Sequence, residues 1–412
     1  MTLREQADFI VKKSIEAVMP DEAVRRALDE IEFDAGGKII LVAAGKAGYE
    51  MARAAAERLG GRISDGVVVT KYGHVKGKIE GVRCFEAGHP IPDENGFSAT
   101  QKALDTVSGL SAHDNVLFLL SGGGSALFEK PLISGEELEK ITKRLLSCGA
   151  DIVEINTVRK RLSAVKGGKF ALACRPAHVY TVVLSDIIGD PLDMIASGPA
   201  YPDASDAAAA LRIAKKYALE LSDAAAALLA QEPPKTLDNV TTFVTGSVKD
   251  LCRAAEKVCA ELGYETVMLT SSLNCEARDA GAFLGAIARD HQHGDKPLAY
   301  LAGGETVVHI TGSGLGGRNQ ETALSAAALI DGCRNTCVFS FGSDGTDGPT
   351  DAAGGYADEN TKAQLSSHGI DIYTALENND SYHALEKVNG LIVTGPTGTN
   401  VNDLALVLID RR

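Results

Sequence analysis

The short loop Ala43-Ala44-Gly45-Lys46-Ala47-Gly48 has residues that could bind an anion. An apolar run leads into the loop and a helical stretch leaves it. The first turn of a helix offers unpaired N–H groups with a partial positive charge, and Lys46 adds a full charge there. We therefore predict that Gly45 and Lys46 bind an anionic ligand. The alternative is a tight turn with a solvated lysine, because the spacing is not that of a Walker A loop.

A second glycine-rich loop follows the apolar run Val116–Leu120. Three consecutive glycines let backbone N–H groups approach a ligand closely, and a serine flanks them on each side. Leu127 stands where a nucleophile elbow requires glycine, so a serine hydrolase is not indicated. The alternative is a flexible turn. The loop predicts ligand contacts from Ser121, Gly122, Gly123, Gly124 and Ser125.

A third loop spans residues 312–317 and contains the pattern G-x-G-x-x-G. A dinucleotide site would need an acidic residue about 20 residues later, but Asp331 comes too early and Asp344 too late. The informative feature is instead Arg318 at the start of the following helix, where a guanidinium, free N–H groups and Asn319 converge. We expect backbone N–H groups of this loop to contact phosphate at Gly314, Gly316 and Gly317.

A basic run, NTVRKRLSAVKGGK, stands out in an acidic chain. It is read equally well as a solvated helix face or as a supply of cations for an anionic ligand. The second interpretation makes Arg159 and Lys166 candidate binding residues.

Oxygen ligands follow other apolar runs. Asp186 and Asp190 come directly after Tyr180–Leu184, and Glu305 follows Leu298–Ala302. Carboxylates of this kind hold Mg²⁺ in phosphoryl-transfer enzymes, although an Asx turn explains the first two equally simply. Two further segments carry candidate binding residues, an acidic glycine-rich loop with Asp344 and a hydroxyl-rich turn with Thr397.

The elements that must position these loops alternate between strand and helix in the first half of the chain. Unbroken apolar runs separated by helical segments indicate a mainly parallel sheet that is covered on both faces. Ligands of such sheets bind outside the carboxyl ends of the strands, which is where the polar loops fall.

The length of 412 residues predicts two domains. Pro233-Pro234 blocks helix continuation, so we expect an N-terminal α/β domain over residues 1–235 and a C-terminal α/β domain over 236–412. We also expect the last residues to pack back on the first domain, and Thr306–Thr311 to form a strand.

The formal net charge of −14 argues against nucleic acid or an anionic membrane as a partner. The eight cysteines are scattered and no C-x-x-C occurs, so we expect free thiols and no zinc site. No signal peptide or long apolar run is present, and a cytoplasmic protein is expected.

Taken together, the loops resemble the class II glycerate 2-kinase family with its C-terminal MOFRL segment. The matching strings occur in family order along nearly the whole chain: AAGKA, LLSGGGSALFEKP, INTVRKRLSAVKGGKFA, VLSDIIGDPLDMIASGP, LAGGETVV, GLGGRNQE, SDGTDGPTDAAGG and TGPTGTNVNDL. One departure is Arg161, where the family more often has histidine.

This resemblance implies two α/β domains facing a deep cleft, the N-terminal one Rossmann-like. It implies transfer of the ATP γ-phosphoryl group to D-glycerate, with Lys46 and Arg318 as the catalytic cations and 2-phosphoglycerate as the product. Mg²⁺ would accompany ATP, with Asp186, Asp190 or Glu305 as ligands.

Two other functions remain open at this stage. Members of this family are often labelled hydroxypyruvate reductases, which would use NAD(P)H. A sugar-acid or nucleotide sensor would bind ligand without releasing ADP. The sequence leaves undecided the position phosphorylated, the phosphate donor, the general base and the oligomeric state, for which a homodimer is a hypothesis.

Overall fold

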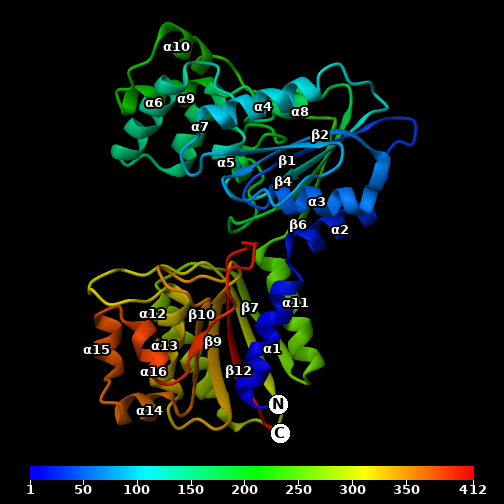
Figure 1. Ribbon diagram of the computed structural model, residues 1–412. Helices are drawn as coiled ribbons and strands as arrows, with labels where there is room; N and C mark the ends of the chain where they lie inside the picture. Colours follow the sequence, from blue (N-terminus) through cyan, green and yellow to red (C-terminus); the bar gives the residue numbers. More distant parts are fainter. The chain divides into compact units, whose positions relative to one another are not determined.

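The apolar runs in the first half of the chain pair into one six-stranded sheet in the computed structural model, which describes residues 1–412 (Figure 1). The strand order is β3-β2-β1-β4-β5-β6, and neighbouring strands from β3 through β5 all pair in parallel. This is the order of the doubly wound α/β fold, in which the order reverses between β1 and β4. The strands are β1 (Ile39–Ala44), β2 (Ile63–Lys71), β3 (Val82–Ala87), β4 (Asn115–Leu120), β5 (His178–Leu184) and β6 (Val240–Gly246).

Helices cover both faces of this sheet. Every residue of β1 and β4 is buried, which requires a layer on each side. In Figure 1, α3 and α4 lie on opposite sides of the strands. The helices before β6 are α2 (Pro20–Glu30), α3 (Gly48–Leu59), α4 (Glu94–Thr106), α5 (Gly124–Leu127), α6 (Gly135–Ser147), α7 (Ile152–Leu162), α8 (Lys169–Ala173), α9 (Ala207–Lys216) and α10 (Asp223–Leu229).

The second sheet is mixed. Its order is β11-β10-β9-β12-β8-β7, and only β7 and β8 pair in parallel. The final strand β12 lies in the middle, where Asp403 stands opposite both Gly304 and Gly342. The strands are β7 (Glu265–Leu273), β8 (Leu298–Gly304), β9 (Thr336–Gly342), β10 (Gly354–Asp358), β11 (Leu391–Ile392) and β12 (Asp403–Ile409).

The second sheet is also covered on both faces. Figure 1 shows α1 and α11 on one side and α12 and α13 on the other. Leu324, Val338 and Val407 belong to one continuous apolar core between α13 and the sheet. The helices are α1 (Leu3–Glu16), α11 (Val248–Glu261), α12 (Ala277–Asp290), α13 (Arg318–Ile330), α14 (Thr361–Ser367), α15 (Ile372–Glu377) and α16 (Ser381–Lys387).

The two sheets define two structural units. The parallel-sheet unit comprises residues 23–185 and 190–245, and the mixed-sheet unit comprises residues 1–22, 186–189 and 246–412. The division therefore differs from the predicted boundary at residue 235. Pro233-Pro234 precedes β6, and β6 still belongs to the first sheet because it pairs next to β5.

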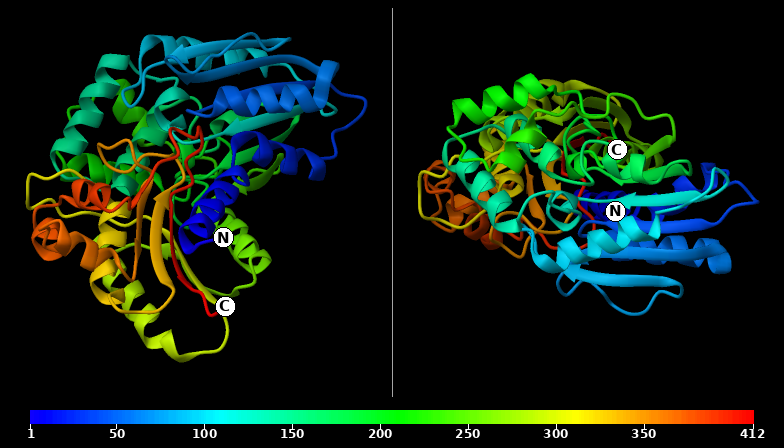
Figure 2. Two further views of the ribbon diagram at one scale, coloured as in Figure 1. Left: turned by 60° about the horizontal axis from the view of Figure 1, so that its bottom comes forward. Right: turned by 90° about the horizontal axis from the view of Figure 1, so that it is seen from above.

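The chain ends lie together in the mixed-sheet unit (Figure 2). Gln6 of α1 donates to Asp410 at 3.2 Å, and its amide oxygen accepts from Arg412 at 3.2 Å. The last strand, β12, is a central strand of the second sheet, and the residues after it contact Gln6 of α1. The N-terminal helix α1 also belongs to the mixed-sheet unit, although the chain that follows it enters the parallel-sheet unit.

Thr306–Thr311 does not form a strand, contrary to the prediction. Only Val307 makes an isolated bridge, to Glu276. The backbone N–H of Thr311 donates instead to the side chain of Asn379 at 2.8 Å, which fixes this segment as an ordered loop.

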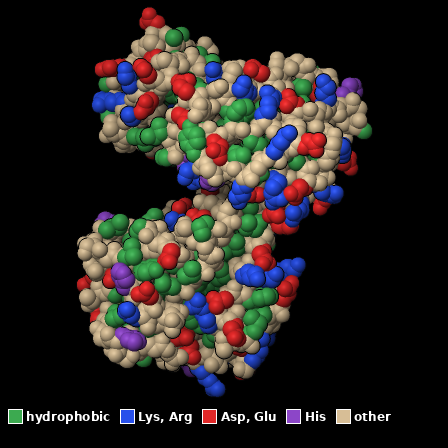
Figure 3. All heavy atoms as spheres, in the orientation of Figure 1, with side chains coloured by type: hydrophobic (Ala, Val, Ile, Leu, Met, Phe, Trp, Pro, Cys, Tyr) green, Lys and Arg blue, Asp and Glu red, His purple; other side chains and the backbone are tan.

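On the face shown in Figure 3, Lys and Arg side chains are intermixed with Asp and Glu side chains. All eight cysteines are free thiols, as predicted. None of the helices combines the length and the apolar character that a membrane span requires.

Candidate active site

In the parallel-sheet unit, the first candidate loop lies where the strand order reverses. Gly45 follows β1 with φ of 123°, and a Cβ atom there would lie 2.2 Å from Ser121 Oγ of the loop after β4. The N–H of Lys46 donates to Gly122 O at 2.9 Å, and that of Ala47 donates to Ser121 Oγ at 3.0 Å. Only glycine permits this approach, so residue 45 and the two hydrogen bonds lock the loops together.

This interlocking fixes the backbone of Lys46 and leaves its side chain exposed. The carbonyl oxygen of Lys46 accepts from the Thr70 hydroxyl at 3.3 Å and lies 2.9 Å from His74 Nδ1. The ammonium group thus stands at the carboxyl edge of the sheet on a rigid base. The structure brings together the predicted residues Gly45, Lys46 and Ser121–Ser125 at this edge.

Two residues of the basic run bind the backbone of the serine–glycine loop 121–125 and of the residues just after it. Lys166 is fully buried, and its ammonium donates to Ser125 O at 2.8 Å and to Phe128 O at 3.2 Å. Arg159 donates to the same Ser125 oxygen at 3.1 Å, and Glu129 lies 3.5 Å from both cations. Burial lowers the pKa of Lys166 to about 8. Both residues therefore hold the serine–glycine loop in place, and their direct contact with a ligand stays a prediction.

Arg161, the departure from the family pattern, lies inside the protein. Its Nη1 donates to Thr157 O at 3.0 Å and to Ser205 Oγ at 2.9 Å, with Asp203 at 3.4 Å. The guanidinium thus contributes to packing around Asp203.

In the mixed-sheet unit, Arg318 is the first residue of α13. Its guanidinium binds Asp403 through two nitrogens, with Nη2 to Oδ1 at 2.9 Å, and its Nη1 lies 3.4 Å from Glu305 Oε1. The Asp403 side chain is 7% exposed and that of Arg318 is 32% exposed, so the fork is fixed from inside while part of it reaches solvent. Burial would lower the pKa of Arg318, but the hydrogen bonds to Asp403 outweigh burial and raise it.

A second buried carboxylate fixes the helix that carries Arg318. Asp347 accepts from the backbone N–H groups of Asn319 at 3.1 Å and Gln320 at 2.8 Å. A Cβ atom on Gly317 would lie 2.3 Å from Asp347 Cγ, so a glycine is required there. A carboxylate at this position complements the partial positive charge of the helix start. The first turn of α13 is therefore capped by the protein itself.

These contacts change the predicted roles of the third loop. The N–H of Gly314 donates to Asn378 O at 2.8 Å, so in this conformation it is not free for a phosphate. Asn319 is buried, and its side chain binds Ser340 and Asp347. Both residues therefore have structural contacts in this conformation, and their contact with a ligand stays a prediction. Gly316 and Gly317 remain candidates.

Two further candidates lie close together at the same end of the second sheet. The N–H of Thr397 donates to Asp344 O at 3.1 Å, and its hydroxyl donates to Ser343 O at 2.6 Å. A Cβ atom on Gly342 would lie 3.2 Å from Asp344 Oδ1 and 3.3 Å from Asp403 Oδ1, which places both carboxylates beside that glycine.

The predicted metal ligands fall into different units. Asn402 Nδ2 donates to the Glu305 carboxylate at 3.2 Å and to the Asp186 carbonyl oxygen at 3.1 Å, which ties these two residues together in the mixed-sheet unit. Asp190 belongs to the parallel-sheet unit. The chain contains no cluster of three or more potential metal-ligating side chains.

Reasoning from the sequence missed Asp347 and Asp403. Both stand inside the quoted strings SDGTDGPTDAAGG and TGPTGTNVNDL, which was the available signal. It also passed over His74 and His89, which lie near Lys46 at the edge of the first sheet.

Two family descriptions match most of this chain. Residues 6–230 match a domain of unknown function, DUF4147, and residues 298–403 match the MOFRL family. A protein of Thermotoga maritima named D-glycerate 2-kinase is 52% identical to this chain over 99% of each. The chain belongs to the MOFRL-containing glycerate kinase family.

The structural comparison agrees with this membership, which confirms the resemblance. A crystal structure of a glycerate kinase from Thermotoga maritima superposes with a TM-score of 0.95, covers 99% of each chain and has 52% sequence identity. One protein of Agrobacterium vitis, provisionally named a hydroxypyruvate reductase, is 37% identical over 90% of this chain and 87% of its own. Both names thus occur among the relatives.

The cap on α13 predicts a specific pH dependence of stability. Burial raises the pKa of Asp347 to about 6, although Gln320 and Asn319 N–H groups oppose this. The folded protein therefore keeps this proton to higher pH than the unfolded chain does. Stability from this group is fully present below about pH 4 and is lost as pH rises through about 6, by roughly 3 kcal/mol.

In Asp347→Asn this loss is absent, because the amide does not titrate. We expect the free energy of unfolding of the wild type, minus that of Asp347→Asn, to fall between about pH 4 and pH 7. Urea unfolding of both proteins at several pH values measures this difference. The contributions of all other titrating groups are the same in both proteins and cancel in the difference. A difference that is constant over this range would contradict the assignment.

Proposed function

We propose that this protein is an ATP-dependent D-glycerate 2-kinase. The observation that carries the proposal is the Arg318 guanidinium, which Asp403 holds in a fixed orientation with part of it open to solvent. Phosphoryl transfer requires mainly positioned cations, because charge develops on the oxygens of the transferred group. The name of the Thermotoga maritima relative, D-glycerate 2-kinase, supports glycerate as the acceptor and its 2-hydroxyl as the position phosphorylated.

Lys46 supplies a second cation, on the parallel-sheet unit. Its backbone is immobilised by hydrogen bonds, and it stands at the point of strand-order reversal where doubly wound folds bind ligands. We assign Lys46 to the transferring phosphoryl group. Arg318, with its planar fork, is suited to phosphate or to the glycerate carboxylate.

Mg²⁺ is consistent with this proposal, as the ion that binds together with the nucleotide. Mg²⁺ is usually bound by one or two carboxylates together with substrate phosphates, so the lack of a three-residue cluster is compatible with it. Glu305 and Asp186, tied through Asn402, are the residues we propose to hold it. The ion would neutralise charge on the nucleotide oxygens.

The reductase alternative is less well supported by the geometry. In a dinucleotide-binding sheet an acidic residue near the end of β2 binds the ribose hydroxyls. Here β2 ends at Lys71, and the loop after β1 carries Lys46. Two lysines near this edge favour phosphate groups over the ribose contact of NAD.

The product of the reaction tests the function directly. With ATP, Mg²⁺ and D-glycerate, we expect ³¹P and ¹H NMR to show ADP and 2-phosphoglycerate. A parallel reaction with NADH and hydroxypyruvate, followed by nicotinamide absorbance, serves as the control for the alternative. Oxidation of NADH without phosphorylation of glycerate would overturn the proposal, and binding of ATP without release of ADP would indicate a sensor.

Lys46→Met tests the second cation. Loss of one positioned charge at the reacting group should lower kcat by about 10²–10³. Lys46→Arg should recover part of this loss, and Lys78→Met, which removes an exposed lysine of the same unit, should behave as wild type. Stability should be unaffected, because the Lys46 side chain is exposed. Wild-type kcat in Lys46→Met would exclude the role.

A further inference from the structure

His89 lies at the same sheet edge as Lys46. It comes two residues after the end of β3, and β3, β2, β1 and β4 are parallel neighbours, so their carboxyl ends share one edge. The glycine loop shows how close the side chains are. A Cβ atom on Gly123 would lie 3.1 Å from His89 Nε2 and 3.2 Å from Lys46 Cγ. The imidazole and the lysine therefore flank the same point above Gly123.

The His89 ring is not used for structure. Its side chain is partly buried, yet neither ring nitrogen forms a hydrogen bond within the chain. Two other histidines of this unit differ, since His74 Nδ1 lies 2.9 Å from Lys46 O and His178 Nε2 lies 2.9 Å from the Thr241 hydroxyl. His89 thus keeps its hydrogen-bonding capacity for a ligand.

The charges around His89 keep the imidazole neutral. Burial lowers its pKa below the usual range, and Lys46, Lys71 and His74 lower it further. The two acidic groups of its own segment are engaged elsewhere. Glu86 accepts from the N–H of Val75 at 2.8 Å, and Asp93 accepts from the Tyr72 hydroxyl at 2.6 Å. A neutral imidazole has one nitrogen that accepts a proton.

Two further carboxylates of this unit are also engaged in ion pairs. Glu50 pairs with Arg53 at 2.9 Å and with Lys76 at 2.8 Å. Glu129 is fully buried beneath Lys166. Among the side chains that flank Lys46, the imidazole of His89 is therefore the group best able to take up a proton.

We propose that His89 is the catalytic base that accepts the proton of the glycerate 2-hydroxyl, an assignment that rests on the proposed kinase function. The hydroxyl oxygen forms a bond to the γ-phosphorus as the bond from that phosphorus to the β,γ-bridging oxygen breaks. ADP leaves with the electron pair, and the hydroxyl proton passes to the neutral ring, which later releases it to water. The acceptor oxygen must approach the phosphorus that Lys46 holds, which brings it within reach of His89.

Substrate charge assists this step. ATP and glycerate are both anionic, and negative charge near an imidazole raises its pKa. Binding of both substrates therefore offsets the positive charges of Lys46 and Lys71 near His89 and makes the ring a better proton acceptor at the moment of transfer.

The test compares wild type with His89→Gln, which keeps a polar side chain but cannot take up the proton. We expect kcat for phosphorylation of D-glycerate to fall by about 10²–10⁴, with little change in KM. The acid limb of the kcat–pH profile should be present in wild type and absent in His89→Gln. Imidazole added to His89→Gly should restore part of the rate.

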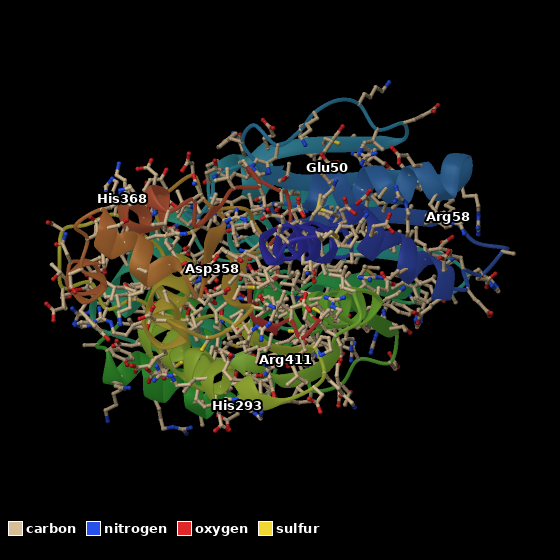
Figure 4. All side chains as sticks on the ribbon, turned by 90° about the horizontal axis from the view of Figure 1, so that it is seen from below. Glu50, Arg58, His293, Asp358, His368 and Arg411 are labelled. Atoms are coloured by element: carbon tan, nitrogen blue, oxygen red, sulfur yellow. The ribbon has the colours of Figure 1, made fainter.

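The matched control is His368→Gln, at the end of α14 on the mixed-sheet unit, where the side chain is exposed (Figure 4). It should retain wild-type kcat and pH profile. If the wild type itself forms no phosphoglycerate, the kinase function fails. If it does, and His89→Gln keeps wild-type kcat or the same acid limb, only the assignment of His89 fails.

A second measurement covers the case in which His89→Gln does not fold. In the wild type with D-glycerate and a non-hydrolysable ATP analogue, NMR titration of His89 should give the same midpoint as the acid limb of kcat. Different midpoints would contradict the assignment.

Discussion

The position of Arg318 on the mixed-sheet unit depends on its ion pair with Asp403. A buried carboxylate without a partner is strongly unfavourable, so Asp403 in the middle of the second sheet requires the guanidinium beside it. The same requirement fixes the orientation of the Arg318 fork. Asp347 fixes the backbone that carries Arg318, because its carboxylate accepts hydrogen bonds from the first N–H groups of α13. Side chain and backbone are thereby positioned before any substrate binds, which is what electrostatic catalysis demands.

The parallel-sheet unit fixes its cation by a different route. Lys46 has its backbone held by the loop after β4, and the close approach of Gly45 to Ser121 makes this possible. Lys166 in turn holds that second loop by its carbonyl oxygens from inside the unit. The side chain of Lys46 is exposed, which suits a compact point charge that binds phosphate. The Arg318 guanidinium is thus fixed by an ion pair, whereas the Lys46 backbone is fixed by hydrogen bonds to the neighbouring loop.

Much of this could be predicted from the sequence because it depends on local pattern. The buried strands, the glycine loops at their ends and the positions of Lys46 and Arg318 all follow from runs of neighbouring residues. The contacts that define the site do not. Asp403 lies 85 residues from Arg318, and the pairing arises only because β12 inserts between β8 and β9. His89 and Gly123 meet only because β3 and β4 are parallel members of one sheet. Pro233-Pro234 gave a strong local boundary signal, but sheet pairing carried β6 into the first unit.

The most direct measurement of the central claim is a double-mutant cycle on kcat with wild type, Asp403→Asn, Arg318→Ala and the double variant. If Asp403 acts by orienting Arg318, Arg318→Ala lowers kcat by at least about 10³, and Asp403→Asn also lowers it. In the Arg318→Ala background, Asp403→Asn should then cause little further loss. Equal losses from Asp403→Asn in both backgrounds, or an unchanged kcat in Asp403→Asn alone, would contradict the account.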